Sequence, residues 1–194
     1  MTEIDRNLPY QIRAMQTGDL VQVQSIDRDS FSLPWPTSAY NYELSNPQSL
    51  LWVAEIPGEV SPPKIVGMIV LWLIVDEAHV ATLAVEPEYR QQGIGRRLLA
   101  TALREAAHKG LREATLEVRA NNLVAQRLYQ KFMFETVGFR PHYYRDNNED
   151  ALIMTMKNLG ETFLDWLDSL DWNNSPKVDS LAQPASTSSQ NVMD

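Results

Sequence analysis

One stretch, residues 80–132, constrains the fold more than any other, because its hydrophobic period alternates between that of a strand and that of a helix. Short apolar runs at 80–85 and 114–118 predict two strands. After each run, apolar residues recur at steps of three and four, which predicts a helix. Gly110 is expected to end the first helix, because glycine enters a left-handed cap without strain. The stretch is therefore predicted to form two consecutive strand–turn–helix units.

The flanking sequence predicts further strands and two short helices near the N-terminus. These helices are expected to begin near Thr17 and at Thr37, on either side of the proline-rich elbow FSLPWP. The count is about seven strands and four helices, in one mixed α/β domain over residues 1–159. Residues 160–194 are predicted to be an acidic tail, with an amphipathic helix at 161–172 and disorder from Asn173. The additional strands are predicted at 10–15, 50–56, 64–75, 134–144 and 151–156.

Composition excludes several classes of protein. The longest apolar run, IVGMIVLWLIV, has 11 residues, well short of the roughly 20 that a membrane-spanning helix needs. The acids near the N-terminus do not fit a secretory signal. The chain contains no cysteine, which excludes disulfides, thiolate nucleophiles and zinc–thiolate clusters. These features favour a soluble protein of the cytoplasm.

The charge of the chain is unevenly spread. The net charge is −8, and residues 160–194 hold six acids against one base. Residues 90–112 reverse the sign, with six bases and one acid. An acidic chain with one basic helix favours a small anionic ligand over a nucleic acid. A solvated helix face is the alternative explanation of the basic residues.

The loop RQQGIG lies between a predicted strand and a predicted helix and is a candidate anion site. Its two glycines let a ligand approach the backbone, and the unpaired N–H groups of a helix start suit a pyrophosphate. Arg90, Arg96 and Arg97 add positive charge nearby. The loop is not a dinucleotide fingerprint, since Leu98 replaces the third glycine, and it lacks the Gly-Lys-Ser/Thr of a Walker loop. A tight connection without a ligand is the alternative.

Two side chains of the second unit could carry chemistry. Glu117 alternates with Leu116 and Val118, so it should face the opposite side of the sheet from them. A strand glutamate can also simply face solvent or pair with an arginine such as Arg119. Tyr129 lies on the apolar stripe of the following helix, where a tyrosine more often packs than reacts. The three histidines lack the spacing of metal ligands, so no metal site is predicted.

The order of these motifs resembles the GCN5-related N-acetyltransferase family. The matching segments are LAVEPEYRQQGIGRRLL, LEVRANN and LYQKF, within a resemblance over roughly residues 10–157. The elbow residues LPW and the pair Tyr143–Tyr144 followed by EDA are similar to the bacterial ribosomal-protein-alanine N-acetyltransferases of the RimI type. The resemblance implies a mostly antiparallel sheet, splayed in the middle by a bulge that admits the pantetheine arm of coenzyme A.

The same resemblance implies acetyl-CoA as co-substrate and roles for particular residues. Glu117 would be the general base, directly or through a water, and Tyr129 the general acid that protonates the departing thiolate. A backbone N–H of the strand would hold the acetyl oxygen, the glycine loop the pyrophosphate, and Asn122 the thiol end. The absence of cysteine agrees with direct transfer. The implied cofactor-binding residues are Leu83, Ala84, Val85, Arg90, Gln91, Gln92, Gly93, Ile94, Gly95, Arg96 and Asn122.

One position departs from the family pattern. The family usually has Gly-Phe after the second helix, whereas Met133 precedes Phe134 here. A non-glycine residue in a left-handed cap costs about 1–2 kcal/mol, which leaves open a different ending of this helix. The spacing from Tyr129 to Tyr143–Tyr144 favours a simple substitution of the glycine.

The acceptor amine must be neutral when it attacks. At pH 7, deprotonation costs about 1.4 kcal/mol or less for an α-amino group and about 4.6 kcal/mol for lysine. This difference favours an N-terminal amine, and the resemblance implies the N-terminal alanine of a small-subunit ribosomal protein, with no nucleic acid or membrane as partner. The alternatives are acetylation of a protein lysine or a small amine, and a coenzyme-A-binding sensor without turnover. The role of the tail and the oligomeric state are left open.

Overall fold

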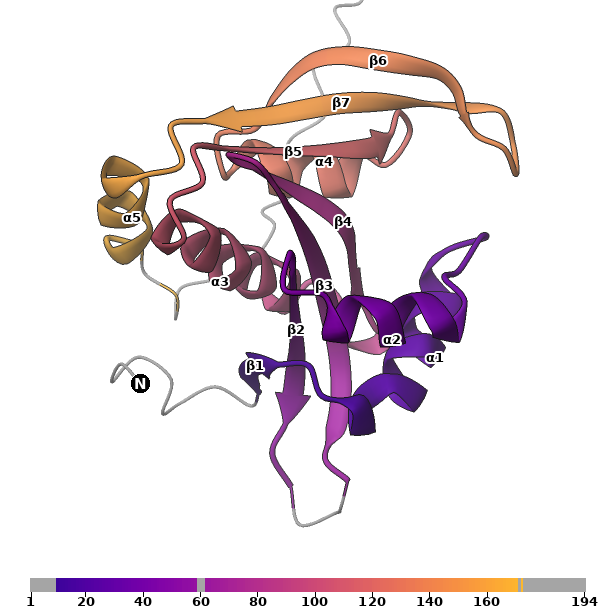
Figure 1. The fold of residues 1–194 in the computed structure, drawn as a ribbon. Helices are drawn as coiled ribbons and strands as arrows, with labels where there is room; N and C mark the ends of the chain where they lie inside the picture. The colour runs from indigo at the N-terminus through magenta and orange to yellow at the C-terminus, as the bar shows by residue number, and fades with distance from the viewer. Residues whose placement is uncertain (1–9, 59–61, 171, 173–194) are drawn as a thin grey trace, which may run out of the picture.

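The structure is a computed structural model of the 194-residue chain, and it describes residues 10–58, 62–170 and 172. Seven strands form one sheet in the order β1–β2–β3–β4–β5–β7–β6 (Figure 1). Every neighbouring pair is antiparallel except β4 and β5, which are parallel. The strands are β1 (Gln11–Ala14), β2 (Ser49–Ile56), β3 (Lys64–Ile74), β4 (Glu77–Val85), β5 (Glu113–Arg119), β6 (Glu135–Tyr144) and β7 (Glu149–Lys157).

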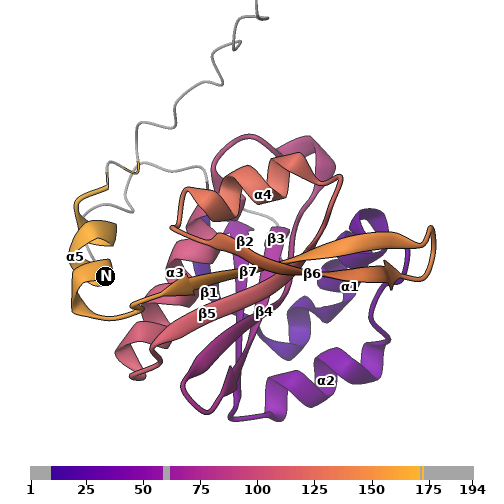
Figure 2. The ribbon, with the colours of Figure 1, turned by 90° about the horizontal axis from the view of Figure 1, so that it is seen from above.

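Five α-helices cover the two faces of this sheet (Figure 2). Helices α1 and α2 lie on one face, α3 and α4 lie on the other, and α5 lies beside α3. The predicted mixed α/β fold of about seven strands is confirmed, with a fifth helix at the start of the predicted tail. The helices are α1 (Leu20–Ser30), α2 (Thr37–Ser45), α3 (Ile94–His108), α4 (Leu123–Gln130) and α5 (Glu161–Asp168).

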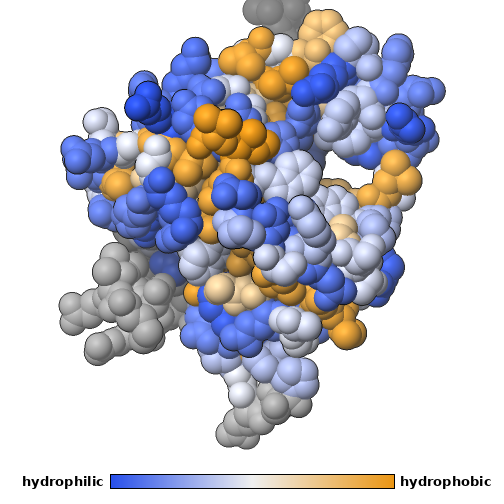
Figure 3. Space-filling view, in the orientation of Figure 1, coloured by the Kyte–Doolittle hydropathy of each residue, from blue (hydrophilic) through white to orange (hydrophobic). Residues whose placement is uncertain are grey.

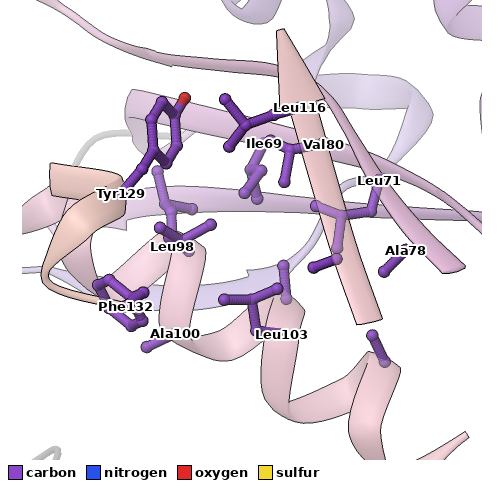
Figure 4. Packing of buried hydrophobic residues seen from close by; sticks show 14 of the residues in the cluster. Ile69, Leu71, Ala78, Val80, Leu98, Ala100, Leu103, Leu116, Tyr129 and Phe132 are labelled. Atoms are coloured by element: carbon purple, nitrogen blue, oxygen red, sulfur yellow. The ribbon is translucent and has the colours of Figure 1, made fainter. Parts of the chain in front are cut away.

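Each face of the sheet has its own apolar core. The main core packs α3 against the sheet, with Leu98 and Leu103 fully buried (Figure 4). The second core lies under α1 and α2 and contains Val23 and Tyr40. Strand β3 contributes to both cores. Its long apolar run is therefore buried on both faces, as a continuous hydrophobic strand requires.

The sheet opens between β4 and β5. These strands pair only at Glu77–His79 with Glu113–Thr115, and the register among the described residues goes no further. On the other edge of β4, the ladder with β3 shifts by one residue, so that Val70 faces Thr82 and Leu71 faces Val80. The extra residue, Ala81, is a β-bulge, which bends a strand and increases its twist. The bulge and the splayed pair that the family resemblance implies are both present.

Helix α4 ends in the left-handed turn that the family pattern provides with glycine. Met133 has φ 61°, and the Phe134 N–H donates to the Tyr129 carbonyl while the Met133 N–H donates to the Gln130 carbonyl. These two bonds are those of a Schellman motif. Methionine therefore replaces the glycine without changing the end of the helix, at the conformational cost of a non-glycine residue in this region.

Helix α5 begins at Glu161, as expected, and ends four residues earlier than the predicted amphipathic segment. Its residues Phe163 and Leu167 are buried in the main core. The residues from Asn173, where disorder was predicted, lie outside the described part of the chain. Among the helices of the described residues, none combines the length and the apolar composition that crossing a bilayer requires.

Candidate functional site

Glu117 lies in the middle of β5, on the face of the sheet away from α3. Its neighbours Leu116 and Val118 enter the main core, so the alternation of the strand directs Glu117 to the opposite face. Its side chain is 11% exposed and is held from two sides. One carboxylate oxygen lies 3.3 Å from Nε2 of His79 on β4, and the other lies 2.9 Å from Nη2 of Arg140 on β6. The carboxylate therefore does not point into bulk water.

A column of stacked rings leads from this carboxylate to the elbow between α1 and α2. The imidazole of His79 stacks on Trp72, with ring centroids 5.5 Å apart. Trp72 stacks on Trp35 of the elbow at 5.9 Å, and Trp35 lies against Tyr40 at 5.3 Å. The elbow thus joins the wall of the same face on which Glu117 lies.

The elbow is fixed by a buried carboxylate of α1. Asp27 is 1% exposed and accepts a hydrogen bond from the backbone N–H of Trp35 at 2.6 Å. Burial raises the pKa of Asp27, and the bond from Trp35 opposes that rise. The prolines stiffen the elbow chain, and this bond sets where the stiff segment docks. The ring of Trp35 is thereby held in the column.

The bulge at Ala81 changes which residues of β4 face the main core, from even-numbered positions before it to odd-numbered positions after it. Val80 lies in the main core, and Leu83 and Val85, beyond the bulge, also pack against it. Ala84 is buried in the second core. Beyond His79, the edge of β4 that faces β5 has no ladder partner among the described residues of β5. Its backbone N–H and C=O groups can therefore bond to an extended ligand arm, as an open strand edge does.

The glycine loop leads directly from this strand into α3. Gln91 and Gly93 have φ 62° and 83°, and Gly93 is the N-cap of the helix. The N–H of Arg97 donates to the Gly93 carbonyl, so the N–H groups of the three residues between them precede the first bond of the helix. Such N–H groups, with the helix dipole, form a ready anion site. At Gly95, an added Cβ would lie 3.6 Å from Val85 and 3.7 Å from Leu128.

The side chains of Arg90, Gln92 and Ile94 bond to or pack against the protein itself. Arg90 donates from Nε to the Val85 carbonyl at 2.9 Å and from Nη2 to Ser30 at 3.3 Å, so it braces the loop against β4 and α1. Gln92 donates to the Glu88 carbonyl at 3.2 Å. The side chain of Ile94 is buried in the main core. Of these three residues, Ile94 can therefore offer a ligand only its backbone.

Tyr129 belongs to the face of the sheet opposite Glu117. It is 8% exposed, lies in the main core, and contacts the ring of Phe134 at a centroid distance of 5.8 Å. Figure 4 shows its ring beside Leu98, with the hydroxyl directed away from Phe132. Burial raises the pKa of Tyr129, and the nearby Tyr144 adds to the rise. The phenol therefore keeps its proton at neutral pH.

Asn122 caps α4, so the turn that follows β5 places it beside the opening. Its side-chain oxygen accepts a hydrogen bond from the Ala125 N–H at 3.1 Å. The amide N–H₂ group of the same side chain is not used in that bond. Asn122 can therefore cap the helix and donate to a ligand at the same time.

A cluster of polar side chains, here called the clasp, joins the β6–β7 turn to the elbow. Arg119 of β5 donates to Asp146 at 2.8 Å, to Glu149 at 3.1 Å and to Ser32 at 3.1 Å. Ser32 donates in turn to Asp146. The ring of Tyr144 lies 3.9 Å from the Arg119 guanidinium carbon. The space-filling view shows an opening between the β6–β7 hairpin and the part formed by α1 and α2 (Figure 3).

The arrangement suits the transfer of a group between two ligands that meet at the opened sheet. One ligand has an anionic group for the glycine loop and an extended arm for the edge of β4. The other approaches the carboxylate of Glu117 from the face of α1 and α2. Within the described residues, no cluster of three or more histidine, aspartate or glutamate side chains could hold a metal ion.

Comparison with known proteins identifies the family. The family model described as "Acetyltransferase (GNAT) family" matches residues 20–134, more than half of the chain. The chain belongs to the GNAT acetyltransferase family. This acetyltransferase is 38% identical over 144 residues to a Bacillus subtilis (strain 168) protein, covering 74% of this chain and 92% of that one. The name of that relative gives it, provisionally, as a [ribosomal protein bS18]-alanine N-acetyltransferase.

Solved structures agree with the family assignment. The Escherichia coli ribosomal-protein-S18-alanine N-acetyltransferase has a TM-score of 0.67 and 28% identity, and the match covers 77% of this chain and 94% of that chain. Arabidopsis thaliana NAA60, solved in complex with acetyl-CoA, has a TM-score of 0.70 and 19% identity, covering 76% and 99%. The second likeness concerns the fold alone. The predicted GNAT enzyme class of this acetyltransferase is thus confirmed.

The structure adds residues that the sequence did not single out. His79 and Arg140 hold the carboxylate of Glu117, and Arg119, the expected alternative partner, instead belongs to the clasp. The spacing of the histidines along the sequence fits no metal site, and a contact between two strands leaves no signal in that spacing. Register within the sheet, which places His79 opposite Thr115 and two residues from Glu117, is what brings them together.

Proposed function

We propose that this acetyltransferase moves the acetyl group of acetyl-CoA directly to the N-terminal α-amino group of an alanine on a small-subunit ribosomal protein. The similar Escherichia coli enzyme, whose name specifies ribosomal protein S18 and alanine, supports this acceptor. The fold shared with a neighbour solved with acetyl-CoA supports the donor. The reaction is proposed to take place in the cytoplasm, with no nucleic acid or membrane as partner.

The donor fits the described residues. The N–H groups around Gly93 and Gly95 suit a pyrophosphate, and the open edge of β4 from Val80 to Val85 suits an amide-rich arm. Asn122 lies at the start of α4 with a free donor for the thiol end. Bound acetyl-CoA supplies the acetyl group as a thioester. The chain's own residues would bind it through backbone groups and hold it within the opened sheet.

The single observation that carries the proposal is the position of Glu117. Its carboxylate stands at the opening, on the face that also carries the elbow, while Tyr129 lies on the other face. The amine would therefore approach from one side of the sheet and the sulfur leave on the other. Glu117 would accept the proton of the attacking amine, the new C–N bond would form as the C–S bond breaks, and Tyr129 would donate its proton to the sulfur.

The proposal is tested by mass spectrometry of two peptides after incubation with acetyl-CoA. One peptide begins with a free alanine, and the other has a blocked N-terminus and an internal lysine. Acetylation of the first peptide alone is expected. Acetylation of the second alone would refute the N-terminal acceptor and support the lysine alternative, and the same assay with polyamines tests the small-amine alternative.

Catalysis by these residues is tested with Glu117→Gln and Tyr129→Phe. Each is expected to lower kcat by about 10²–10⁴-fold while coenzyme A affinity is kept, because general acid–base catalysis contributes this much. Glu135→Gln is the matched control, since Glu135 lies exposed on β6, and it should leave kcat unchanged. Unchanged rates in both site variants would overturn the assignment. Coenzyme A binding without any turnover by the parent protein would identify a sensor instead.

A further inference from the structure

A segment made of α5, residues 169–170 and Trp172 lies along α3, with Trp172 nearest the glycine loop. The family model matches residues 20–134, so it does not cover this segment. Helix α5 lies beside α3 (Figure 1). Phe163 and Leu167 anchor α5 in the main core, and Asp168 forms an ion pair with Arg104 of α3. Because later residues of the segment meet earlier residues of α3, the segment reaches the first turn of that helix.

At that first turn, Trp172 lies over two arginines. Its ring centroid is 4.8 Å from the guanidinium carbon of Arg96 and 5.7 Å from that of Arg97. Both distances lie within the range of a cation–π interaction. Trp172 is itself half-buried and packs against the main core. The indole is therefore held by the protein rather than resting on the arginines alone.

Arg96 follows directly after the two glycines of the loop, where its N–H precedes the first helical bond. A ring over one face of a guanidinium leaves its N–H edge available for anionic oxygens. An arginine that is already stacked also has less rotamer freedom to lose when it binds an anion. The contact thus prepares Arg96 to meet a phosphate group.

The contacts that the described part of the segment makes with α3 favour the exposure of Arg96 to a ligand over its neutralisation by a carboxylate. The segment gives Arg104 a carboxylate, Asp168, but gives Arg96 an uncharged ring. Among the described residues, no carboxylate forms an ion pair with Arg96. The charge of Arg96 is therefore available to a ligand.

We propose that Trp172 is a positioning residue of the cofactor site, which holds Arg96 where it binds the phosphates of coenzyme A. This inference rests on the proposed function, since it assigns a further residue to the same donor site. It makes Trp172, which α5 brings beside the first turn of α3, part of the binding apparatus of this chain.

The test is calorimetric titration of the full-length protein with coenzyme A. Trp172→Ala is expected to weaken binding about 3–10-fold, equal to about 0.7–1.4 kcal/mol at 1.4 kcal/mol per tenfold, and Trp172→Phe should recover most of it. With acetyl-CoA as substrate, Trp172→Ala should raise KM and leave kcat unchanged. With S-acetylpantetheine, which has no phosphates, both constants should stay unchanged.

Two further variants separate this role from a structural one. Arg104→Gln removes another arginine of α3 together with its contact to the segment, and it should leave coenzyme A affinity unchanged. In an Arg96→Met background, Trp172→Ala should have little further effect, because the two residues act as one unit.

Several results would overturn the inference. Unchanged or tighter coenzyme A binding by Trp172→Ala would do so, the latter because it indicates masking. An equal loss with and without Arg96, or an equal loss with S-acetylpantetheine, would show that Trp172 acts through packing. A parent protein that does not bind coenzyme A at all would instead refute the proposed function, and this inference with it.

Discussion

The sheet has two sides, strands β1–β4 and strands β5, β7 and β6, and each side is held by long backbone ladders. The ladder that joins the two sides, between β4 and β5, is short. Strands β2 and β3 share eight residue pairs and β5 and β7 share seven, whereas β4 and β5 share three. Backbone ladders therefore hold each side together, and side chains hold one side against the other. The difference shows how a continuous sheet can contain an opening for ligands without dividing the protein into two domains.

Two groups of side chains bridge the opening. On one face, the main core joins Leu71 of β3 to Leu116 of β5 beneath α3 (Figure 4). On the other face, the clasp joins Arg119 to the elbow through Ser32. The first bridge is apolar and fully buried, and the second is polar and partly exposed. They should differ greatly in strength, and the following variants measure that difference.

The largest effect is expected from Leu116→Ala. Leu116 is 1% exposed in the main core, and truncation of a buried leucine costs about 2–5 kcal/mol. Chemical denaturation should show this loss in the free energy of unfolding. Val137→Ala is the control, because Val137 is 58% exposed on β6 and surface changes stay within about 0.5 kcal/mol. A loss below about 1 kcal/mol for Leu116→Ala would mean that the apolar bridge does not hold the two sides together.

A pair of glycine variants compares the packing of the two sides. At Gly67 of β3, an added Cβ would lie 3.1 Å from Ile94 and from Leu98 of α3, and 3.2 Å from the Ala84 carbonyl. Gly67→Ala should therefore destabilise the protein by about 1–3 kcal/mol, the usual cost of overpacking. At Gly138 of β6, the added Cβ would meet only Ile153, at 3.7 Å.

Gly138→Ala should accordingly be neutral or slightly stabilising, since alanine has less freedom to lose from the unfolded chain. Thermal unfolding of both variants under the same conditions decides the comparison. Equal losses of stability at the two positions would contradict the close approach of α3 to β3 at Gly67. A loss of stability in Gly138→Ala alone would mean that the tighter packing is at β6 and not at β3.

The sequence predicted what depends on neighbours along the chain. Hydrophobic periodicity predicted the strands and helices, because it depends only on the residues of the element itself. The glycine loop could be predicted because Gly93 adopts φ 83°, a backbone conformation that glycine reaches without steric cost. Met133 shows the limit of such rules, since it adopts φ 61° where the family pattern has glycine. The helix still ends in the Schellman turn, closed by the bond from the Phe134 N–H to the Tyr129 carbonyl, despite that local cost.

The sequence could not predict contacts between distant elements. The contacts of His79 and Arg140 with Glu117 depend on the strand register of the sheet. The stacking of Trp172 on Arg96 depends on where α5 lies. Neither leaves a periodic signal, because each residue is an ordinary polar or aromatic position in its own element. The family resemblance supplied the candidate roles of Glu117 and Tyr129, which remain predictions.

The smallest effect is expected from acid, and of the two bridges it should act only on the clasp. The bond from Ser32, together with Arg119, holds the pKa of Asp146 below its usual range. The backbone N–H of Asn121 lowers the pKa of Glu149, with smaller effects from Asn147 and Arg119. A carboxyl whose pKa is lowered by folding contributes stability above its ordinary pKa of about 4, and loses it as pH falls through the lowered value. The clasp should therefore loosen below about pH 4, while the apolar bridge does not respond.

NMR titration of the carboxyl groups measures the pKa values of Asp146 and Glu149 directly. Ser32→Ala should raise the pKa of Asp146 and leave that of Glu149 in place, whereas Arg119→Gln should raise both pKa values, that of Asp146 more. Arg127→Gln, which removes an exposed arginine of α4, should change neither. If Arg119→Gln left both pKa values unchanged, the clasp would be a set of independent surface contacts. The opening would then be held from one face only, by the core beneath α3.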